Sequence, residues 1–495
     1  RAVRGGKARL TLTSAVDANL GSKVFSLTGM EANVSELSML GVRGSLRLSG
    51  NATGNSARNV WTAKGLRVTA DLVGKDLPGG KLKGVLTATA VLDSGKQKLT
   101  VSKFGAKTLG ISAKGNVAVT GLGSSPVFRG DVSVGRFSPR KLMARLNITA
   151  PKLKDRNTLS NASFGATFSG TTKRIRLKPL LLKLDDTTLR GEFSADGFPR
   201  PRYRFNLAAN GIDADRYMAA KARKGKSTRG SSAATPGAAA AAATTLPPAT
   251  LRSLNLNGRL SVGRLKIANL RLAKVSLTAK GKDGLIRLSP VSARLYRGTY
   301  AGNITLDARG KVPALRVDEK LNNIDIDRFL TDLNGEAPLG GRVTLAAKLT
   351  TTGDNGRALV RGLNGNIDFN VQNGIAQGPT WNKYRNKIRN GLGQLALGGV
   401  QCNLSGVLAS PTTRFNQLIG TATVKNGVVQ IPQRQMIKIR AQAQKLDIDA
   451  FGSIDLPKER VDLRTQLKVY EKCQVLGQKI RFDLSKIKIP VRIVG

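Results

Sequence analysis

Apolar and polar residues alternate with a period of two along most of the chain. Residues 343–350 are the clearest case, because Val, Leu and Ala at odd positions alternate with Thr, Ala and Lys at even positions. Residues 461–469 and 486–493 follow the same rule, and similar runs recur from Leu10 onward. Successive side chains of a strand point to opposite faces, so each run predicts a strand with one apolar and one polar face.

Turn-forming dipeptides separate these predicted strands. Asn or Asp followed by Gly is the preferred pair in tight hairpin turns. The pairs that carry this signal are Asp196-Gly197, Asp283-Gly284, Asn373-Gly374 and Asn426-Gly427. Together with the alternation they predict an all-β fold, built as a long antiparallel meander.

Few segments predict helices. Ser138 followed by Pro139 is a typical helix start, which leads into a short helix up to about Leu146. A second helix is expected from about Thr380 to Asn390. Single helical turns are expected at residues 213–218 and 325–330.

An internal repeat indicates stacked units. Residues 212–218 (IDADRYM) match residues 324–330 (IDIDRFL), and residues 137–143 (FSPRKLM) form a degenerate third copy. We therefore predict an elongated architecture with an N-terminal part at 1–218 and a C-terminal part at 251–495. Residues 219–250 are basic and then rich in Ala, Ser, Thr and Pro, which predicts a disordered linker loop.

The composition excludes most catalytic chemistry. No histidine is present, which removes Ser–His–Asp triads and histidine metal ligands, and no G-x-S-x-G, Walker A or CxxC motif occurs. The remaining candidates are acid pairs, namely Asp185/Asp186, Asp213/Asp215 and Asp325/Asp327. We predict that the spaced pairs cap turns and pair with Arg216 and Arg328, rather than act in catalysis or bind Ca²⁺. The sequence thus predicts no enzyme activity, no metal and no cofactor.

The chain is strongly basic, with 81 Lys and Arg against 31 Asp and Glu and a net charge of +50. Such a charge suits nucleic-acid binding. However, the basic residues are spread over nearly every predicted strand, aromatic residues are 4%, and no recognition module occurs. We therefore expect no specific nucleic-acid partner, and predict that the charge coats the polar outer side. The positions that support this are Lys173, Arg174, Arg176, Lys178, Lys183, Arg464 and Lys468.

The cysteines and the membrane signal add little. Cys402 and Cys473 are the two cysteines, too few for a disulfide scaffold. They could pair in an oxidising compartment, but two isolated cysteines are more often buried and unpaired. The sequence contains no run of about 18 apolar residues, so it predicts no transmembrane helix.

The apolar face of the predicted sheet must be covered by something. It can pack as a filled core, or it can line a groove whose guest covers it. Alternation alone favours the filled core and does not separate the two.

Several segments, in this order and spacing, resemble the AsmA family of bacterial envelope proteins. They are residues 137–146, 184–191, 324–337, 363–374, 421–428 and 489–493. The resemblance implies a periplasmic body, anchored in the inner membrane by an N-terminal helix that is absent from this sequence. It also implies a long antiparallel sheet, curved into a taco-shaped groove with an apolar lining.

The implied role is to carry phospholipid towards the outer membrane and so to support outer-membrane assembly. The expected partners are phospholipid acyl chains, the inner membrane and outer-membrane or assembly proteins. The resemblance carries over no catalytic residue. The residues expected to line the groove are Val343, Leu345, Leu349, Leu463, Leu467, Ile487, Ile489 and Val491. The alternative is a periplasmic scaffold for outer-membrane proteins, with a filled core and no lipid cargo.

Overall fold

The computed structural model describes residues 7–39, 41–219, 248–393, 400–402, 407–475 and 481–494. Strands account for 66% of it and helices for 12%, which confirms the all-β prediction with few short helices. The chain forms two compact units. Unit 1 comprises Arg1–Ile212 and Arg216–Ala222, and unit 2 comprises Asp213–Asp215 and Arg223–Gly495. The predicted linker, residues 219–250, lies almost entirely outside the described residues.

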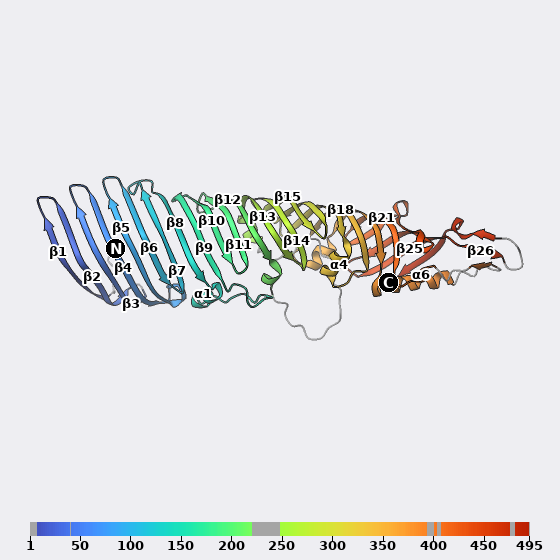
Figure 1. Cartoon of the computed structure of the whole chain (residues 1–495), viewed down its shortest axis with the longest axis horizontal. Coiled ribbons are helices and arrows are strands. Elements are labelled where there is room, and N and C mark those ends of the chain that lie inside the picture. The colour runs from blue at the N-terminus through green and yellow to red at the C-terminus, as the bar shows by residue number, and fades with distance from the viewer. Residues whose placement is uncertain are drawn as a thin grey trace. The chain divides into compact units, whose positions relative to one another are not determined.

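Unit 1 is an antiparallel meander in which each strand pairs with the next along the chain (Figure 1). Its strands are β1 (Lys7–Asn19), β2 (Val24–Met39), β3 (Val42–Asn55), β4 (Val60–Gly74), β5 (Lys81–Asp93), β6 (Lys98–Thr108), β7 (Ile111–Thr120), β8 (Val127–Phe137), β9 (Ala162–Thr171), β10 (Arg174–Leu184), β11 (Thr187–Asp196) and β12 (Arg202–Asp213). The short helices are η1 (Pro78–Gly80), α1 (Pro139–Arg145) and η2 (Ala214–Tyr217).

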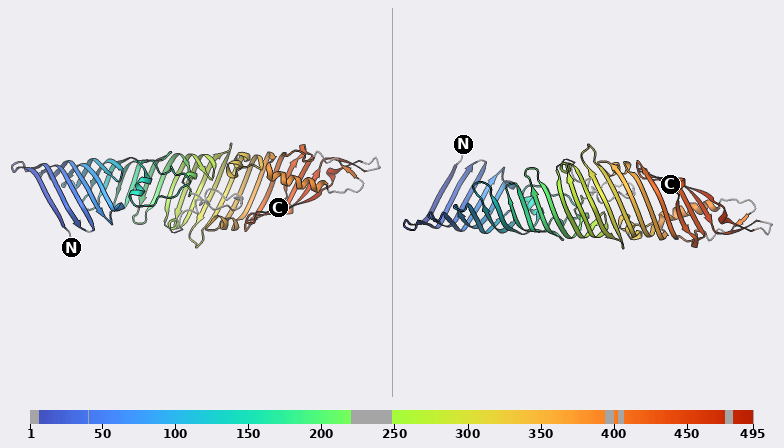
Figure 2. Two further views of the ribbon diagram at one scale, coloured as in Figure 1. Left: turned by 90° about the horizontal axis from the view of Figure 1, so that it is seen from below. Right: turned by 90° about the horizontal axis from the view of Figure 1, so that it is seen from above.

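Bulges interrupt alternate strands of unit 1 near their middle. They lie in β2 at Gly29, in β4 at Gly65, in β6 at Lys103 and in β10 at Pro179. The first three residues have φ between 52° and 64°, and Pro179 lacks the N–H that a regular ladder would need. A bulge bends its strand and increases its twist, so the sheet of unit 1 is curved (Figure 2).

Unit 2 is also built mainly of antiparallel strands, but it contains more helices than unit 1. Its strands in the main sheet are β13 (Asn255–Ile267), β14 (Leu270–Lys282), β15 (Leu285–Leu295), β16 (Gly298–Asp307), β17 (Ala314–Asp325), β18 (Leu339–Thr352), β19 (Asn364–Ala376), β21 (Thr413–Lys425), β22 (Val428–Ile431), β23 (Ile437–Ala441), β24 (Leu446–Asp455), β25 (Arg460–Val469) and β28 (Ile489–Val494). A separate small sheet holds β20 (Val400–Cys402), β26 (Lys472–Val475) and β27 (Arg481–Asp483). The helices are α3 (Pro248–Ser253), α4 (Ile326–Asn334), α5 (Gly356–Arg361), α6 (Gly378–Gly393), η3 (Gln433–Gln435), η4 (Gln442–Gln444) and η5 (Leu484–Lys486).

The helix predictions are confirmed, with changes in length. The Ser138 hydroxyl accepts a hydrogen bond from the N–H of Lys141 and caps α1, with Pro139 in the first turn. The helix expected near Trp381 is α6, which is longer than predicted. The turn expected at Asp325 is the nine-residue helix α4.

One turn prediction is wrong. Asn373-Gly374 lies inside β19, where Asn373 has a φ of 49° and the pairing with β18 shifts register, so that both residues are left out of it. Gly374 has a packing role, because a Cβ there would meet the ring of Phe415 at 2.0 Å. The pair therefore makes a bulge rather than a hairpin turn, whereas Asn426-Gly427 and Asp283-Gly284 do join neighbouring strands.

Candidate functional site

One face of unit 1 carries an unbroken row of apolar residues, which we call the first row. Each of the twelve strands contributes one residue, paired in register with its neighbours. The row runs Leu12, Ala32, Leu48, Val68, Leu86, Ala106, Ala113, Val134, Phe164, Leu182, Leu189 and Ala209. Ala209 is buried, but the other members are exposed or half-buried, and Leu12 is 66% exposed. This side of the sheet, the apolar face, is therefore largely open.

Two further rows extend the apolar face beyond the bulges. The second row runs Val16, Leu27, Ala52, Ala63, Ala90, Val101, Val117, Gly130, Phe168, Leu177, Phe193 and Phe205. The third row contains Trp61, which is 45% exposed and pairs with Gly54. A Cβ at Gly54 would lie 2.3 Å from the indole, so the glycine gives the ring room to lie against the sheet. The surface therefore combines aliphatic side chains with aromatic rings seated on glycines.

The opposite face of unit 1 is polar and basic. One of its rows runs Asp17, Ser26, Thr53, Thr62, Val91, Thr100, Ala118, Arg129, Ser169, Arg176, Ser194 and Arg204. The basic residues that the sequence placed on the outside are exposed, namely Lys173, Arg174, Arg176, Lys178 and Lys183 here and Arg464 and Lys468 in unit 2. The two faces of the sheet thus differ sharply in chemistry.

In unit 2, three of the predicted lining residues share one cross-strand row, the unit 2 row. It runs Ile324, Val343, Val371, Leu418, Ile439, Ile448, Leu467 and Ile489. Leu345 lies two residues along β18 from Val343, on the same face. Leu463 and Val491 lie on the same face of β25 and β28, and Leu349 packs beside Val317.

Much of this face in unit 2 is already covered. Leu467 is 0% exposed and packs with Ile489 in a buried cluster that also holds Ile388 of α6 and Leu408. Val343 is buried in a second cluster, against which α4 packs. Ile487 is 44% exposed and precedes β28, outside the strand predicted for it.

The open apolar surface of unit 1 was not singled out residue by residue from the sequence. The alternation that marks Leu46 and Leu48 in β3, or Leu66 and Val68 in β4, is as clear as that of residues 343–350. What the pattern lacks is any sign of which apolar face a helix will cover. The alternation thus marked the apolar faces of the strands, but whether each face stays open depends on tertiary packing.

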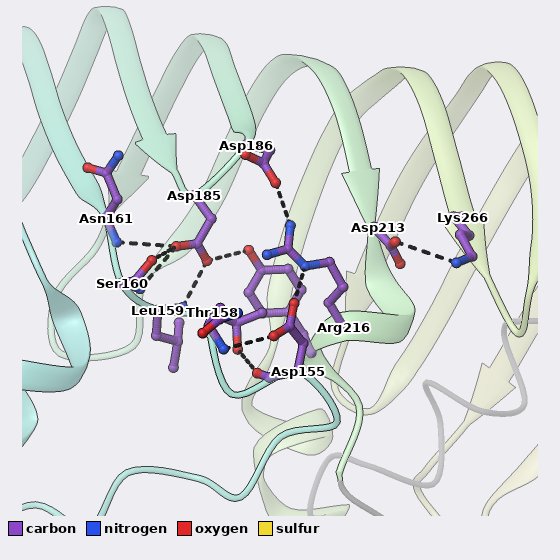
Figure 3. A network of polar contacts seen from close by, with 12 residues as sticks. Asp155, Thr158, Leu159, Ser160, Asn161, Asp185, Asp186, Asp213, Arg216 and Lys266 are labelled. Atoms are coloured by element: carbon purple, nitrogen blue, oxygen red, sulfur yellow. Dashed lines mark hydrogen bonds and ion pairs between the residues drawn. The ribbon is translucent and has the colours of Figure 1, made fainter.

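Asp185 is a structural carboxylate rather than a catalytic one (Figure 3). It accepts hydrogen bonds from the backbone N–H groups of Leu159 (2.8 Å), Ser160 (3.0 Å) and Asn161 (3.2 Å) and from the hydroxyl of Tyr217 (2.7 Å). Partial burial of Asp185 disfavours its charge, but these hydrogen bonds outweigh burial and hold its pKa below the usual value. The carboxylate thus ties the loop before β9 to the β10–β11 turn.

The prediction for Arg216 is wrong in its partners. Its guanidinium pairs with Asp155 at 2.8 Å and with Asp186, not with the adjacent Asp213 or Asp215 (Figure 3). Asp213 lies 3.7 Å from Lys266 instead. Arg216 belongs to unit 1, as Asp155 and Asp186 do, whereas Asp213 and Asp215 belong to unit 2.

The other spaced acids behave largely as predicted. Asp215 caps a turn by accepting the N–H groups of Ala268 and Asn269 at 2.6 and 2.8 Å. Asp325 pairs with Arg328 at 3.6 Å, as expected. Asp215 and Asp325 therefore hold local structure together through these contacts.

Glu319 is an acid within the apolar face of unit 2. It pairs with Gly302 on one neighbouring strand and with Ala347 on the other. The nearest residues of β17 on the same face are Val317 and Leu321. Burial raises the pKa of the Glu319 carboxyl, although a hydrogen bond from the Tyr300 hydroxyl acts in the opposite direction. Burial and Glu319 in turn raise the pKa of Tyr300.

Cys473 is disulfide-bonded in the structure. Cys402, the other cysteine of the sequence, faces it in the pairing of β20 with β26. The sequence left the pairing open and favoured unpaired cysteines, whereas the structure contains a disulfide at Cys473. Spacing along the chain could not reveal that two short strands bring them together.

The part of the chain that the structure describes holds neither a metal-binding cluster nor a membrane-spanning helix. Among its residues, no group of three or more His, Cys, Asp or Glu side chains could hold a metal ion. None of its helices is long and apolar enough to cross a membrane.

These observations define a class of protein: an antiparallel sheet protein whose distinctive surface is an open, extended apolar face. The sequence pattern of the AsmA family matches residues 137–433, more than half of the chain, so the chain belongs to the AsmA family. This family is associated with cell-envelope assembly and lipid transport, and it is not a known enzyme family. A search of curated proteins found no match for the sequence.

Proposed function

We propose that the protein carries phospholipid acyl chains on its apolar face, in the periplasm, and supplies them towards the outer membrane. The observation that carries the proposal is the first row of unit 1, an apolar row of twelve residues, all exposed or half-buried except Ala209. Family membership supports a place in the cell envelope. Anchoring in the inner membrane belongs to the proposal as well.

The energetics of the apolar face favour a mobile guest. Moving a CH₂ group out of water gains about 0.8 kcal/mol, and a chain lying on this face gains much of that, as it does in a bilayer. The lining has few polar groups to fix one ligand. Transfer is then close to neutral in free energy, and its direction follows supply and demand. Of the eight residues predicted in unit 2, those that are only partly buried, such as Leu345, remain part of this proposal.

Photo-crosslinking at adjacent positions of β4 tests the proposal. Val68 belongs to the first row, whereas Thr69 points to the polar face, so one residue step changes the face and little else. A benzophenone amino acid at position 68 should crosslink to phospholipid in cells, as mass spectrometry of the adduct would reveal. The same group at position 69 should give little or none.

A charge placed at the same two positions gives the functional counterpart. Val68→Asp should reduce co-purified phospholipid several-fold, while Thr69→Asp should leave it unchanged. Equal crosslinking at both positions, or no lipid on the purified protein, would refute the carrier proposal. Crosslinks to an outer-membrane protein instead of lipid would favour the scaffold alternative.

A further inference from the structure

A half-enclosed apolar cavity of about 190 Å³ lies inside unit 2. Trp381 and Tyr384 of α6 form one wall, and inner side chains of β18, β19, β21, β23 and β24 form the others. Leu418, Ile439 and Ile448 are successive members of the unit 2 row, so the cavity lies along that row. The cavity therefore lies on the apolar side of the unit 2 sheet, where α6 covers that side.

Two of the polar groups at the cavity bond to each other. The indole N–H of Trp381 donates a hydrogen bond to Thr413 Oγ1 at 3.2 Å, and Thr413 is buried. The rest of the lining is almost wholly hydrocarbon, with Leu339, Ala376 and Phe415 among its members. Apolar cavities of roughly this size stay dry and take up apolar molecules, and an empty one costs stability in proportion to its volume. The apolar lining of the cavity therefore favours a hydrocarbon guest.

The surroundings show where such a guest must end. Beyond the cavity the apolar face is filled by the cluster of Ile388, Leu446 and Leu467. On the other side of the cavity the unit 2 row is also buried, at Val343 and Val371. A chain that enters the half-enclosed cavity through its opening therefore meets a closed end in both directions along the row. We propose that this cavity binds the methyl end of a lipid acyl chain, a subsite that rests on the carrier function proposed above.

The two tryptophans of the sequence make separate reporters. Trp61 lies on the apolar face of unit 1, and Trp381 lines the cavity of unit 2. Trp61→Phe leaves only the cavity reporter, and Trp381→Phe leaves only the unit 1 reporter. Each full-length variant is mixed with phosphatidylcholine vesicles whose acyl chains carry bromine near the methyl end or near the carboxyl end, because bromine quenches indole fluorescence on contact.

The expected result is specific to position along the chain. In Trp61→Phe, methyl-end bromine should quench Trp381 at least twofold more strongly than carboxyl-end bromine. Filling the cavity with Ala376→Leu in the same background should abolish that quenching. Ala346→Leu, on the polar face of β18, is the matched control and should leave it intact.

The outcomes separate the subsite from the carrier function. Quenching of Trp61 without quenching of Trp381 would overturn the subsite and leave the carrier proposal standing. Quenching of neither would overturn both. Equal quenching of Trp381 by the two brominated lipids would overturn the assignment of the methyl end. Because the Trp61→Phe measurement needs no filled cavity, a fold defect in Ala376→Leu cannot hide the answer.

Discussion

Two adjacent carboxylates, Asp185 and Asp186, show how much the surroundings of a residue decide. Asp185 accepts three backbone N–H groups and the Tyr217 hydroxyl, whereas the Asp186 side chain is 86% exposed and meets only Arg216 at the surface. Asp185→Asn should lower the free energy of unfolding by about 1–3 kcal/mol, because three backbone N–H groups and the Tyr217 hydroxyl lose a charged acceptor. Asp186→Asn, the control, should cost under about 1 kcal/mol. Urea unfolding at neutral pH measures both.

The pH dependence of the Asp185 effect has a definite sign. Its pKa is lowered in the folded protein, so its contribution to stability is complete above the unfolded value of 3.8. That contribution is lost as pH falls through the lower folded pKa. The gap between wild type and Asp185→Asn should therefore narrow on acidification. A gap that is constant down to strongly acidic pH would contradict the assignment.

Sequence reasoning at the residue scale succeeded where interactions are local. Ser138 caps α1 and Arg328 pairs with Asp325 because each partner is three residues away. It failed for Arg216, whose partners Asp155 and Asp186 are brought near only by the folded meander. A contact between residues three positions apart can be predicted from the sequence. A contact between distant segments also requires the pairing of the strands to be known.

At the scale of elements, strands were predictable and their irregularities were not. Alternation identified β18 and β25, since period two is a property of any half-buried strand. The same Asn-Gly pair makes a turn at Asn426 and a bulge at Asn373. Positive φ suits both uses, and only the neighbouring strand decides between them.

The Cys473 disulfide should stabilise the small sheet of β20, β26 and β27. It closes a loop of roughly 70 residues, for which chain entropy gives an upper value of about 4 kcal/mol. Cys473→Ser, or reduction of the wild type, should therefore lower the midpoint of unfolding of unit 2. Hydrogen exchange should rise most in β26, which the main sheet does not hold. Unchanged exchange in β26 after reduction would show that the crosslink is not needed there.

At the scale of the whole molecule, the sequence predicted two-faced strands but could not say which apolar faces stay open. Leu467 and Ile489 were expected to line a groove, yet they are buried beneath α6 and residues near Leu408. Leu12 and Val68 belong to the same kind of pattern and remain accessible. Coverage is a tertiary property, because the covering segment lies far away in sequence and its docking leaves no periodic signal.

The net charge of +50 leads to the last prediction, which concerns the outer surface. Basic side chains near an anionic membrane contribute about 1 kcal/mol each at low salt. Raising the ionic strength from about 0.1 M to about 1 M shortens the Debye length from about 10 Å to about 3 Å. Binding of the protein to phosphatidylglycerol vesicles should therefore fall at least tenfold, as co-sedimentation would measure. Quenching of Trp61 by brominated phosphatidylcholine should persist in high salt, because burial of hydrocarbon does not depend on screening. If both signals fell together, the apolar face could not hold lipid independently of the charged coat, and the two faces would have to act as one site.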